Sequence, residues 1–214
     1  MKTIKIVNGT ILTGGKAFIG NIVLKGGKID YVGTQNPEVE EDAHVIDAKG
    51  QYVAPGFIDL HTHGAGGADF MDGTVEAYLT AARMHAIHGT TLLYPTTLTS
   101  TNEALYGSFE TYNKAEELNV DGARFGGMHL EGPYFNPVYA GAQDPRYLRN
   151  PRPEEYIEIL ENVLNLHVGA LHLNLRVQSS LQLNLREEES LLLSDIPMQH
   201  SMSATMHTRQ EQLL

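Results

Sequence analysis

The sequence predicts an α/β protein in which a small N-terminal β-sheet precedes the first units of a parallel (β/α) barrel. Three observations support this prediction. Residues 1–50 alternate polar and apolar side chains around glycine turns, which is typical of short strands. After Gly50, continuous apolar segments alternate with segments of helical periodicity. Polar residues and glycines follow the apolar segments, at the strand ends where barrel enzymes carry their functional groups.

Residues 1–53 are predicted to form the N-terminal β-domain. Lys2 to Asn8 alternates polar and apolar side chains, as a strand with one buried face does. Asn21 to Leu24 and Lys28 to Val32 flank the pair Gly26-Gly27. Because both positions of such a tight turn require a positive φ, the glycine pair predicts a hairpin.

Residues 54–163 are predicted to form three β/α units. The expected strands span Tyr52 to His63, Thr90 to Tyr94 (closed by Pro95) and Phe125 to Glu131. The expected helices follow Thr74 as an N-cap, Ser100 with Glu103 as a capping box, and Pro153 as a first helical residue. Repeated strand–helix units indicate a parallel sheet.

Composition excludes several classes of function. The chain has 214 residues, a formal net charge of −11 and no cysteine. The negative charge, with no basic stripe to offset it, argues against binding to nucleic acid or to an anionic membrane. A metal would have to be held by histidine and carboxylate ligands. The N-terminal segment alternates and no run has transmembrane length, so a cytoplasmic location is expected.

The first predicted barrel strand ends in two histidines. Side chains alternate along a strand, so His61 and His63 point to the same face. Two imidazoles converging there form part of a divalent metal site, and Glu131 is a candidate for a third ligand. In a regular strand Asp59 shares that face one layer deeper, where we expect it to be a structural hydrogen-bond partner.

Longer motifs carry a family resemblance. Pro55 to Gly64 reads Pro-Gly-Phe-Ile-Asp-Leu-His-Thr-His-Gly, which resembles the opening motif of the amidohydrolase superfamily. Gly127 to Pro137, with its His-Leu-Glu-Gly-Pro run, and Gly141 to Pro145 are similar to the N-acetylglucosamine-6-phosphate deacetylase family within it. The resemblance covers residues 1 to about 163. It implies a partial (β/α)8 TIM barrel of the metal-dependent amidohydrolase type with a small N-terminal β-sandwich.

The resemblance also implies an activity and its ligands. The expected reaction hydrolyses the N-acetyl amide of N-acetylglucosamine 6-phosphate, a phosphorylated amino sugar, to glucosamine 6-phosphate and acetate. His61, His63 and Glu131 become the metal ligands, and zinc, iron, manganese and cobalt all suit such a set. Ala142 and Gln143 contact the sugar, although most relatives have a histidine where Gln143 stands. An intact homologue is expected to be a homodimer.

The other histidines have less definite expectations. His129 precedes Glu131 by two residues and shares its strand face, so we expect it either beside the metal ligands or in the core. His44, His85 and His88 have no partner at ligand spacing and are expected to be surface or packing residues.

Residues 164–214 depart from the pattern of the first three quarters. All aromatic residues lie at or before Tyr156, and leucine dominates the tail. One interpretation is a β-hairpin built from two Leu-x-Leu-Asn-Leu-Arg copies. The interpretation we favour is an out-of-frame tail that follows a frameshift near residues 160–170. Read two bases later, Leu193 to Met198 can decode as Ile-Gly-His-Thr-Asp-Ala, and Leu171 to Arg176 as Ala-Pro-Glu-Leu-Glu-Gly, both typical of the family.

The tail lacks the catalytic aspartate, the two further histidine ligands and the phosphate-binding group that the family places on later strands. We therefore expect this truncated chain to be inactive alone. Two alternatives stay open at this point. One is another amidohydrolase, of the dihydroorotase or dipeptidase type, and the other is a non-catalytic fragment that keeps a partial metal site.

Overall fold

The computed structural model describes residues 2–165, 170–174 and 203–207. The chain divides into two compact units between Gly56 and Phe57. In the part of the chain that the structure describes, no helix is both long and apolar enough to cross a membrane.

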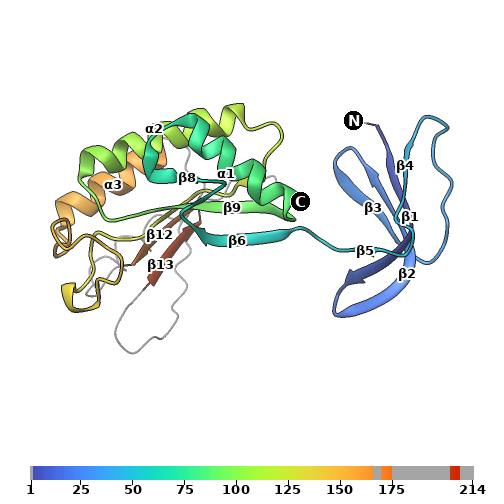
Figure 1. Cartoon of the computed structure of the whole chain (residues 1–214), viewed down its shortest axis with the longest axis horizontal. Coiled ribbons are helices and arrows are strands. Elements are labelled where there is room, and N and C mark those ends of the chain that lie inside the picture. Colours follow the sequence, from blue (N-terminus) through green and yellow to red (C-terminus); the bar gives the residue numbers. More distant parts are fainter. Residues whose placement is uncertain (1, 166–169, 175–202, 208–214) are drawn as a thin grey trace. The chain divides into compact units, whose positions relative to one another are not determined.

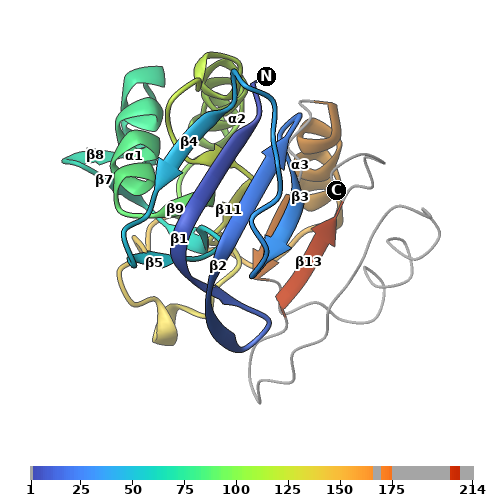
Figure 2. The same ribbon diagram turned by 90° about the vertical axis from the view of Figure 1, so that its right-hand side faces the viewer.

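The N-terminal unit is built on one five-stranded sheet. Its strands are β1 (Ile4–Thr13), β2 (Lys16–Lys25), β3 (Lys28–Gly33), β4 (His44–Asp47) and β5 (Tyr52–Val53). The order is β3-β2-β1-β4, and β5 also pairs with β1 (Figure 2). The predicted hairpin at Gly26-Gly27 is confirmed, since both glycines have positive φ and Lys25 pairs with Lys28. A second sheet, as a sandwich requires, stays a prediction.

The second unit alternates strands and helices. Its strands are β6 (Phe57–Thr62), β7 (Gly64–Ala65), β8 (Ala68–Asp69), β9 (Thr90–Thr97), β10 (Arg124–Phe125), β11 (Met128–Leu130), β12 (Ala170–Asn174) and β13 (Ser203–His207). Its helices are α1 (Val75–Ile87), α2 (Asn102–Leu118) and α3 (Pro153–Asn165), with single 3-10 turns η1 (Phe70–Asp72) and η2 (Pro137–Tyr139).

The main sheet of this unit is parallel from β6 to β12. Strand β9 is central, with β6 on one side and β10 and β11 on the other. Strand β12 extends the sheet beside β11, and β13 closes it as an antiparallel edge. Helices α1, α2 and α3 lie on one side of this sheet (Figure 1). The core between them is aromatic-rich, with Phe70, Tyr78, Phe109 and Tyr112 almost fully buried.

Most predicted helix starts are confirmed. The Thr74 hydroxyl accepts a hydrogen bond from the amide of Ala77, which caps α1, and α3 begins at Pro153. The predicted cap of α2 is wrong by one residue. The N-cap is Thr101 and not Ser100, because the Thr101 hydroxyl accepts a hydrogen bond from the amide of Ala104, three residues later. Two adjacent hydroxyls offer equivalent caps, and only the path of the loop selects one.

The predicted strands are interrupted where proline and glycine allow a change of direction. The strand expected from Tyr52 to His63 is broken at Pro55-Gly56, so β5 and β6 belong to different units. The strand expected from Phe125 to Glu131 is broken at Gly126-Gly127, where a side chain on Gly126 would meet the Tyr94 ring. By contrast β9 continues through Pro95, which stands opposite Thr62.

The predicted tail lies mostly outside the described residues. Only β12 and β13 are described beyond residue 165, and they pair with each other. The second half of the predicted Leu-x-Leu-Asn-Leu-Arg hairpin falls outside the described residues. The frameshift stays a prediction.

Candidate metal centre

Two histidines and one carboxylate meet at the carboxyl end of the parallel sheet. His61 lies in β6, His63 directly follows it, and Glu131 directly follows β11. Oε2 of Glu131 lies 3.1 Å from Nε2 of His63 and 3.6 Å from Nε2 of His61. One ligand atom from each residue falls within 4.8 Å of the others. The three residues predicted as metal ligands are therefore brought together.

The central strand orients this group through Thr96. Nδ1 of His63 lies 3.2 Å from the Thr96 carbonyl oxygen, and the amide of Thr62 donates to the Thr96 hydroxyl at 3.1 Å. A carbonyl only accepts, so Nδ1 of His63 carries the proton in this contact. Its Nε2 then presents a lone pair toward Glu131, which is the tautomer that a metal ligand needs.

Strand β6 contains a bulge between Asp59 and Thr62, which includes His61. Asp59 pairs with Leu93 and Thr62 with Pro95, so β6 advances by three residues where β9 advances by two. The extra residue reverses the alternation of faces. Asp59 was expected on the face of His61, and this is wrong: its carboxylate instead approaches His85 of α1. Its expected role as a hydrogen-bond partner is confirmed, because Oδ1 accepts from the amide of His61.

His129 lies beside the group. Its ring centroid is 4.7 Å from that of His61, with the two rings nearly perpendicular. Its neighbours in β11, Met128 and Leu130, are buried on the opposite face. Of the two positions expected for His129, the structure therefore selects the one beside the candidate ligands.

Two glycines allow the loops around the group to pass closely. Gly64 has φ +153°, and a Cβ there would collide with the Ala68 carbonyl oxygen. Gly132, which follows Glu131, has φ +98°, and a Cβ there would collide with the Thr99 hydroxyl. Both positions adopt backbone conformations that L-residues rarely take. The residues that directly follow the candidate ligands His63 and Glu131 are therefore required to be glycine by the backbone conformation and by the close contact.

The residues predicted to contact the sugar lie in the loop after η2. Ala142 is exposed, whereas Gln143 is 5% exposed, and its Oε1 accepts a 2.7 Å hydrogen bond from the Thr99 amide. Neither residue belongs to the His61, His63 and Glu131 group. In this structure the Gln143 side chain joins two loops, and its contact with a sugar stays a prediction.

Arg149 fastens the loops that follow β9 and β11. Its guanidinium donates to the Glu155 carboxylate at 2.6 Å, to the Ser100 carbonyl at 3.3 Å and to the side chain of Asn102. Its own amide donates to the Pro133 carbonyl at 3.2 Å. The sequence alone gave no indication of this role, because the partners are brought together only by tertiary packing.

The donor set fits a divalent cation. Two imidazole nitrogens and one carboxylate oxygen are the ligands that catalytic zinc sites combine, and related first-row metals accept the same donors. The side chains are 46% (His61), 34% (His63) and 26% (Glu131) exposed, so one side of the group is open to solvent. Three ligands with an open side leave a coordination position for water or substrate.

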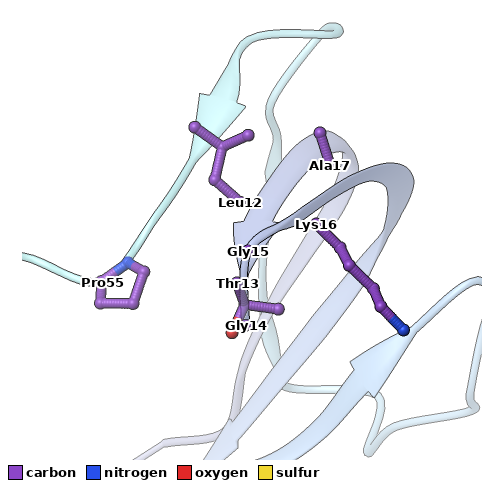
Figure 3. Close-up of a pocket in the computed structure, with 7 residues that line it drawn as sticks. All are labelled: Leu12, Thr13, Gly14, Gly15, Lys16, Ala17 and Pro55. Atoms are coloured by element: carbon purple, nitrogen blue, oxygen red, sulfur yellow. The ribbon is translucent and has the colours of Figure 1, made fainter.

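The N-terminal unit carries a separate hollow of about 530 Å³ (Figure 3). It is lined by residues 12–17 at the turn between β1 and β2, and by Pro55. Lys16 is its single charged residue, and in Figure 3 this side chain extends away from Pro55. The lining offers neither imidazole nor carboxylate, whereas the candidate metal ligands found among the described residues lie in the second unit.

Several known proteins are similar to this chain in sequence. Residues 44–96 match the sequence model of the amidohydrolase family. The N-acetylglucosamine-6-phosphate deacetylase of Bacillus subtilis is 34% identical over 134 residues, which make up 61% of this chain and 34% of that protein. The human N-acetylglucosamine-6-phosphate deacetylase is 30% identical over 168 residues, 74% of this chain and 40% of that protein. This chain thus spans well under half the length of these curated relatives.

Solved structures of proteins with the same name are similar to this chain in fold. The N-acetylglucosamine-6-phosphate deacetylase of Pasteurella multocida superposes with a TM-score of 0.67 at 28% identity, over 75% of this chain and 42% of that one. A variant of the Mycobacterium smegmatis enzyme, in complex with N-acetyl-D-glucosamine-6-phosphate, gives a TM-score of 0.64 at 26% identity, over 77% and 41% of the two chains. In sequence and in fold, this chain is similar to part of the N-acetylglucosamine-6-phosphate deacetylases, and its residues 44–96 match the amidohydrolase family.

Proposed function

We propose that this chain carries the first metal-binding part of a deacetylase that hydrolyses the N-acetyl amide of N-acetylglucosamine 6-phosphate. The observation that supports it most directly is the convergence of His61, His63 and Glu131 within 4.8 Å. The relatives that match the chain are named for this reaction.

The fold proposed for the complete enzyme is a (β/α)8 TIM barrel with an N-terminal β-sandwich. The parallel order β6, β9, β11 supports this, since each strand is joined to the next by a helix on one side of the sheet. The candidate ligands follow the carboxyl ends of β6 and β11, the edge where barrel enzymes hold their active sites.

The chain's own residues would bind and orient the reacting groups. A divalent ion held by such ligands lowers the pKa of a bound water toward neutrality and polarises an amide carbonyl. His61 and His63 would supply neutral nitrogen ligands, and Glu131 would supply negative charge. Thr96 would keep the His63 ring in its tautomer through the Nδ1 contact.

Amide hydrolysis also needs an acid that protonates the departing amine. Among the described residues, no further carboxylic acid joins the candidate group. We therefore propose that this chain binds a divalent metal but does not turn over substrate alone.

Calorimetric titration with Zn²⁺, Mn²⁺ or Co²⁺ tests the metal site. The wild-type chain is expected to bind one equivalent, and His61→Ala to bind at least tenfold more weakly. His44→Ala is a matched control, because His44 is an exposed histidine of the N-terminal unit. Equal affinity for all three proteins contradicts the assignment, as does a wild type that binds no metal.

Acetate release from N-acetylglucosamine 6-phosphate tests the catalytic part of the proposal. We expect no release by the metal-loaded chain above the rate of metal in buffer. A relative from Escherichia coli O157:H7 that is 30% identical over 105 residues is named an N-acetylgalactosamine-6-phosphate deacetylase. Both sugar phosphates should therefore be assayed, and metal-dependent release from either refutes the expected inactivity.

The alternative, a non-catalytic chain with a partial metal site, differs from this proposal in its expected binding of the sugar phosphate. It predicts the same titration but no affinity for the sugar phosphate in the presence of metal. Binding of N-acetylglucosamine 6-phosphate that depends on Glu131 favours the deacetylase origin.

A further inference from the structure

One histidine outside the candidate ligands links both ends of the bulge in β6. His85, in the last turn of α1, places Nε2 at 3.1 Å from the Thr62 hydroxyl. Its Nδ1 lies 3.8 Å from Oδ2 of Asp59. The side chain is largely buried, at 16% exposure, between the helix and the strand. A single imidazole thus touches the residues that precede and follow the extra residue of the strand.

The bulge leaves backbone groups that the regular ladder does not pair. The amide of His61 donates to Oδ1 of Asp59 at 3.1 Å, within the strand itself. The amide of Thr62 donates to the side chain of Thr96. Because these partners are side chains, the position of the strand here depends on what holds those side chains in place.

His85 is suited to hold two of them at once. In the tautomer with a proton on Nδ1, the N–H faces the Asp59 carboxylate and Nε2 is an acceptor for the Thr62 hydroxyl. The Gly64 carbonyl oxygen, 3.2 Å from the same hydroxyl, is the competing acceptor for its single proton. The opposite tautomer would set a lone pair of Nδ1 against a carboxylate. Asp59 then presents Oδ1 to the His61 amide and Oδ2 to His85.

This linkage bears on the spacing of the candidate ligands. Thr62 lies between His61 and His63, and the bulge separates the face of Asp59 from the face of the pair. If the bulge is free to shift, the two imidazoles must be ordered when a metal binds, and that ordering reduces the affinity.

We propose that His85 is a positioning residue for His61 and His63. Through its contacts with Thr62 and Asp59 it holds the bulge of β6 in place, and the bulge determines where the two imidazoles lie. This inference rests on the proposed metal site, since it concerns how that site is held in register. His85 itself is not a metal ligand.

The test compares His85→Leu with His88→Leu in the full chain. His88 is a matched control, because it caps the same helix and its Nδ1 lies 2.8 Å from the carbonyl oxygen of Met84 in that helix. Calorimetric titration with Zn²⁺ is expected to show a 10–100-fold loss of affinity in His85→Leu, the range typical of partners that orient ligands, and less than a threefold change in His88→Leu.

Thr62 provides a second pair of variants, one that keeps the shape of the side chain and one that keeps its hydroxyl. Thr62→Val removes the hydroxyl, whereas Thr62→Ser keeps it. We expect Thr62→Val to reproduce the loss and Thr62→Ser to restore affinity to within threefold of the wild type. A merely space-filling role for this contact predicts the reverse, because valine matches the shape of threonine better than serine does.

A readout without metal separates this inference from the proposed function. Amide hydrogen exchange of the metal-free chain should be faster at His61 in His85→Leu and in Thr62→Val than in the wild type. Unchanged exchange at His61, or unchanged Zn²⁺ affinity in both variants, overturns the inference while the metal site stands. A wild type that binds no metal overturns the proposed function, and with it the positioning role.

Discussion

Oε2 of Glu131 lies 3.1 Å from Nε2 of His63, although β9 separates the two strands that precede these residues. Neighbouring strands lie about 4.8 Å apart, so two steps across the sheet place the strands about 10 Å from each other. Both side chains therefore reach over the central strand, and the bond from His63 to the Thr96 carbonyl holds one of them there. The candidate metal ligands and the Thr96 carbonyl that orients one of them therefore come from three strands, β6, β9 and β11, and not from one sequence motif.

Glu131→Gln is expected to weaken binding of Zn²⁺ at least tenfold, because an amide oxygen carries no negative charge. The fold should change little, since the Glu131 side chain is partly exposed. Calorimetry measures the affinity and circular dichroism the fold. Glu117→Gln, at an exposed position of α2, is the control and should bind as the wild type does. Equal loss in both variants would show that net charge alone governs binding.

Gly64→Ala should destabilise the second unit more than Gly67→Ala. Both glycines have positive φ, a backbone conformation that L-residues rarely adopt. Only at Gly64 would the new Cβ also collide with backbone, at the Ala68 carbonyl, whereas nothing lies within 4 Å of a Cβ at Gly67. Urea unfolding of the two variants gives the comparison. Equal free energies of unfolding would mean that β7 and β8 move apart without cost.

Arg149→Met is expected to destabilise the second unit by about 3–5 kcal/mol, because it leaves the 4% exposed Glu155 carboxylate without its main counter-charge. The double variant Arg149→Met with Glu155→Leu should recover much of that loss. Denaturant midpoints of the two single variants and the double variant measure the coupling. If the two single losses simply add in the double variant, the pair does not act as a unit.

High pH is expected to destabilise the second unit through its buried tyrosines. Burial raises the pKa of Tyr78, Tyr112 and Tyr134. The unfolded chain loses these protons near pH 10 while the folded chain keeps them. Because the folded state then binds more protons, the free energy of unfolding is unaffected below pH 10 and falls as the pH rises above it. Tyrosinate absorbance should therefore rise in two phases, the later one together with unfolding; a single phase near pH 10 with the fold intact contradicts this.

Leu60→Lys is expected to reduce self-association. Among the described strands β6 pairs only with β9, so its other edge is open, and Ile58 and Leu60 are 60% and 66% exposed. An open apolar edge favours pairing with another chain, and a lysine opposes it. Light scattering over a concentration series measures the effect. Leu118→Lys, at an exposed leucine on the last residue of α2, should leave association unchanged.

Three local signals in the sequence predicted local structure correctly. Thr74 caps α1, Pro153 opens α3, and Gly26-Gly27 forms a hairpin turn, because each depends on neighbours a few residues away. The convergence of His61 and His63 agrees with the predicted shared face, since both Nε2 atoms approach Oε2 of Glu131.

The features that the sequence did not reveal depend on distant partners. The face of Asp59 follows from the register between β6 and β9, and an extra residue in that register leaves no mark in the sequence. The contact of His85 with Thr62 depends on how α1 packs on the sheet. Glu131 was identified by resemblance to a family, because nothing in its own strand relates it to β6.

The backbone around the histidine pair has a consequence for the replacement of a candidate ligand. The amides of His61 and Thr62 bond to Asp59 and Thr96, and neither bond involves the imidazole rings. Only the His63 ring also bonds to main chain, at the Thr96 carbonyl oxygen. Replacement of His61 therefore leaves every one of these backbone hydrogen bonds in place, so that a chain without this nitrogen should keep the same strand.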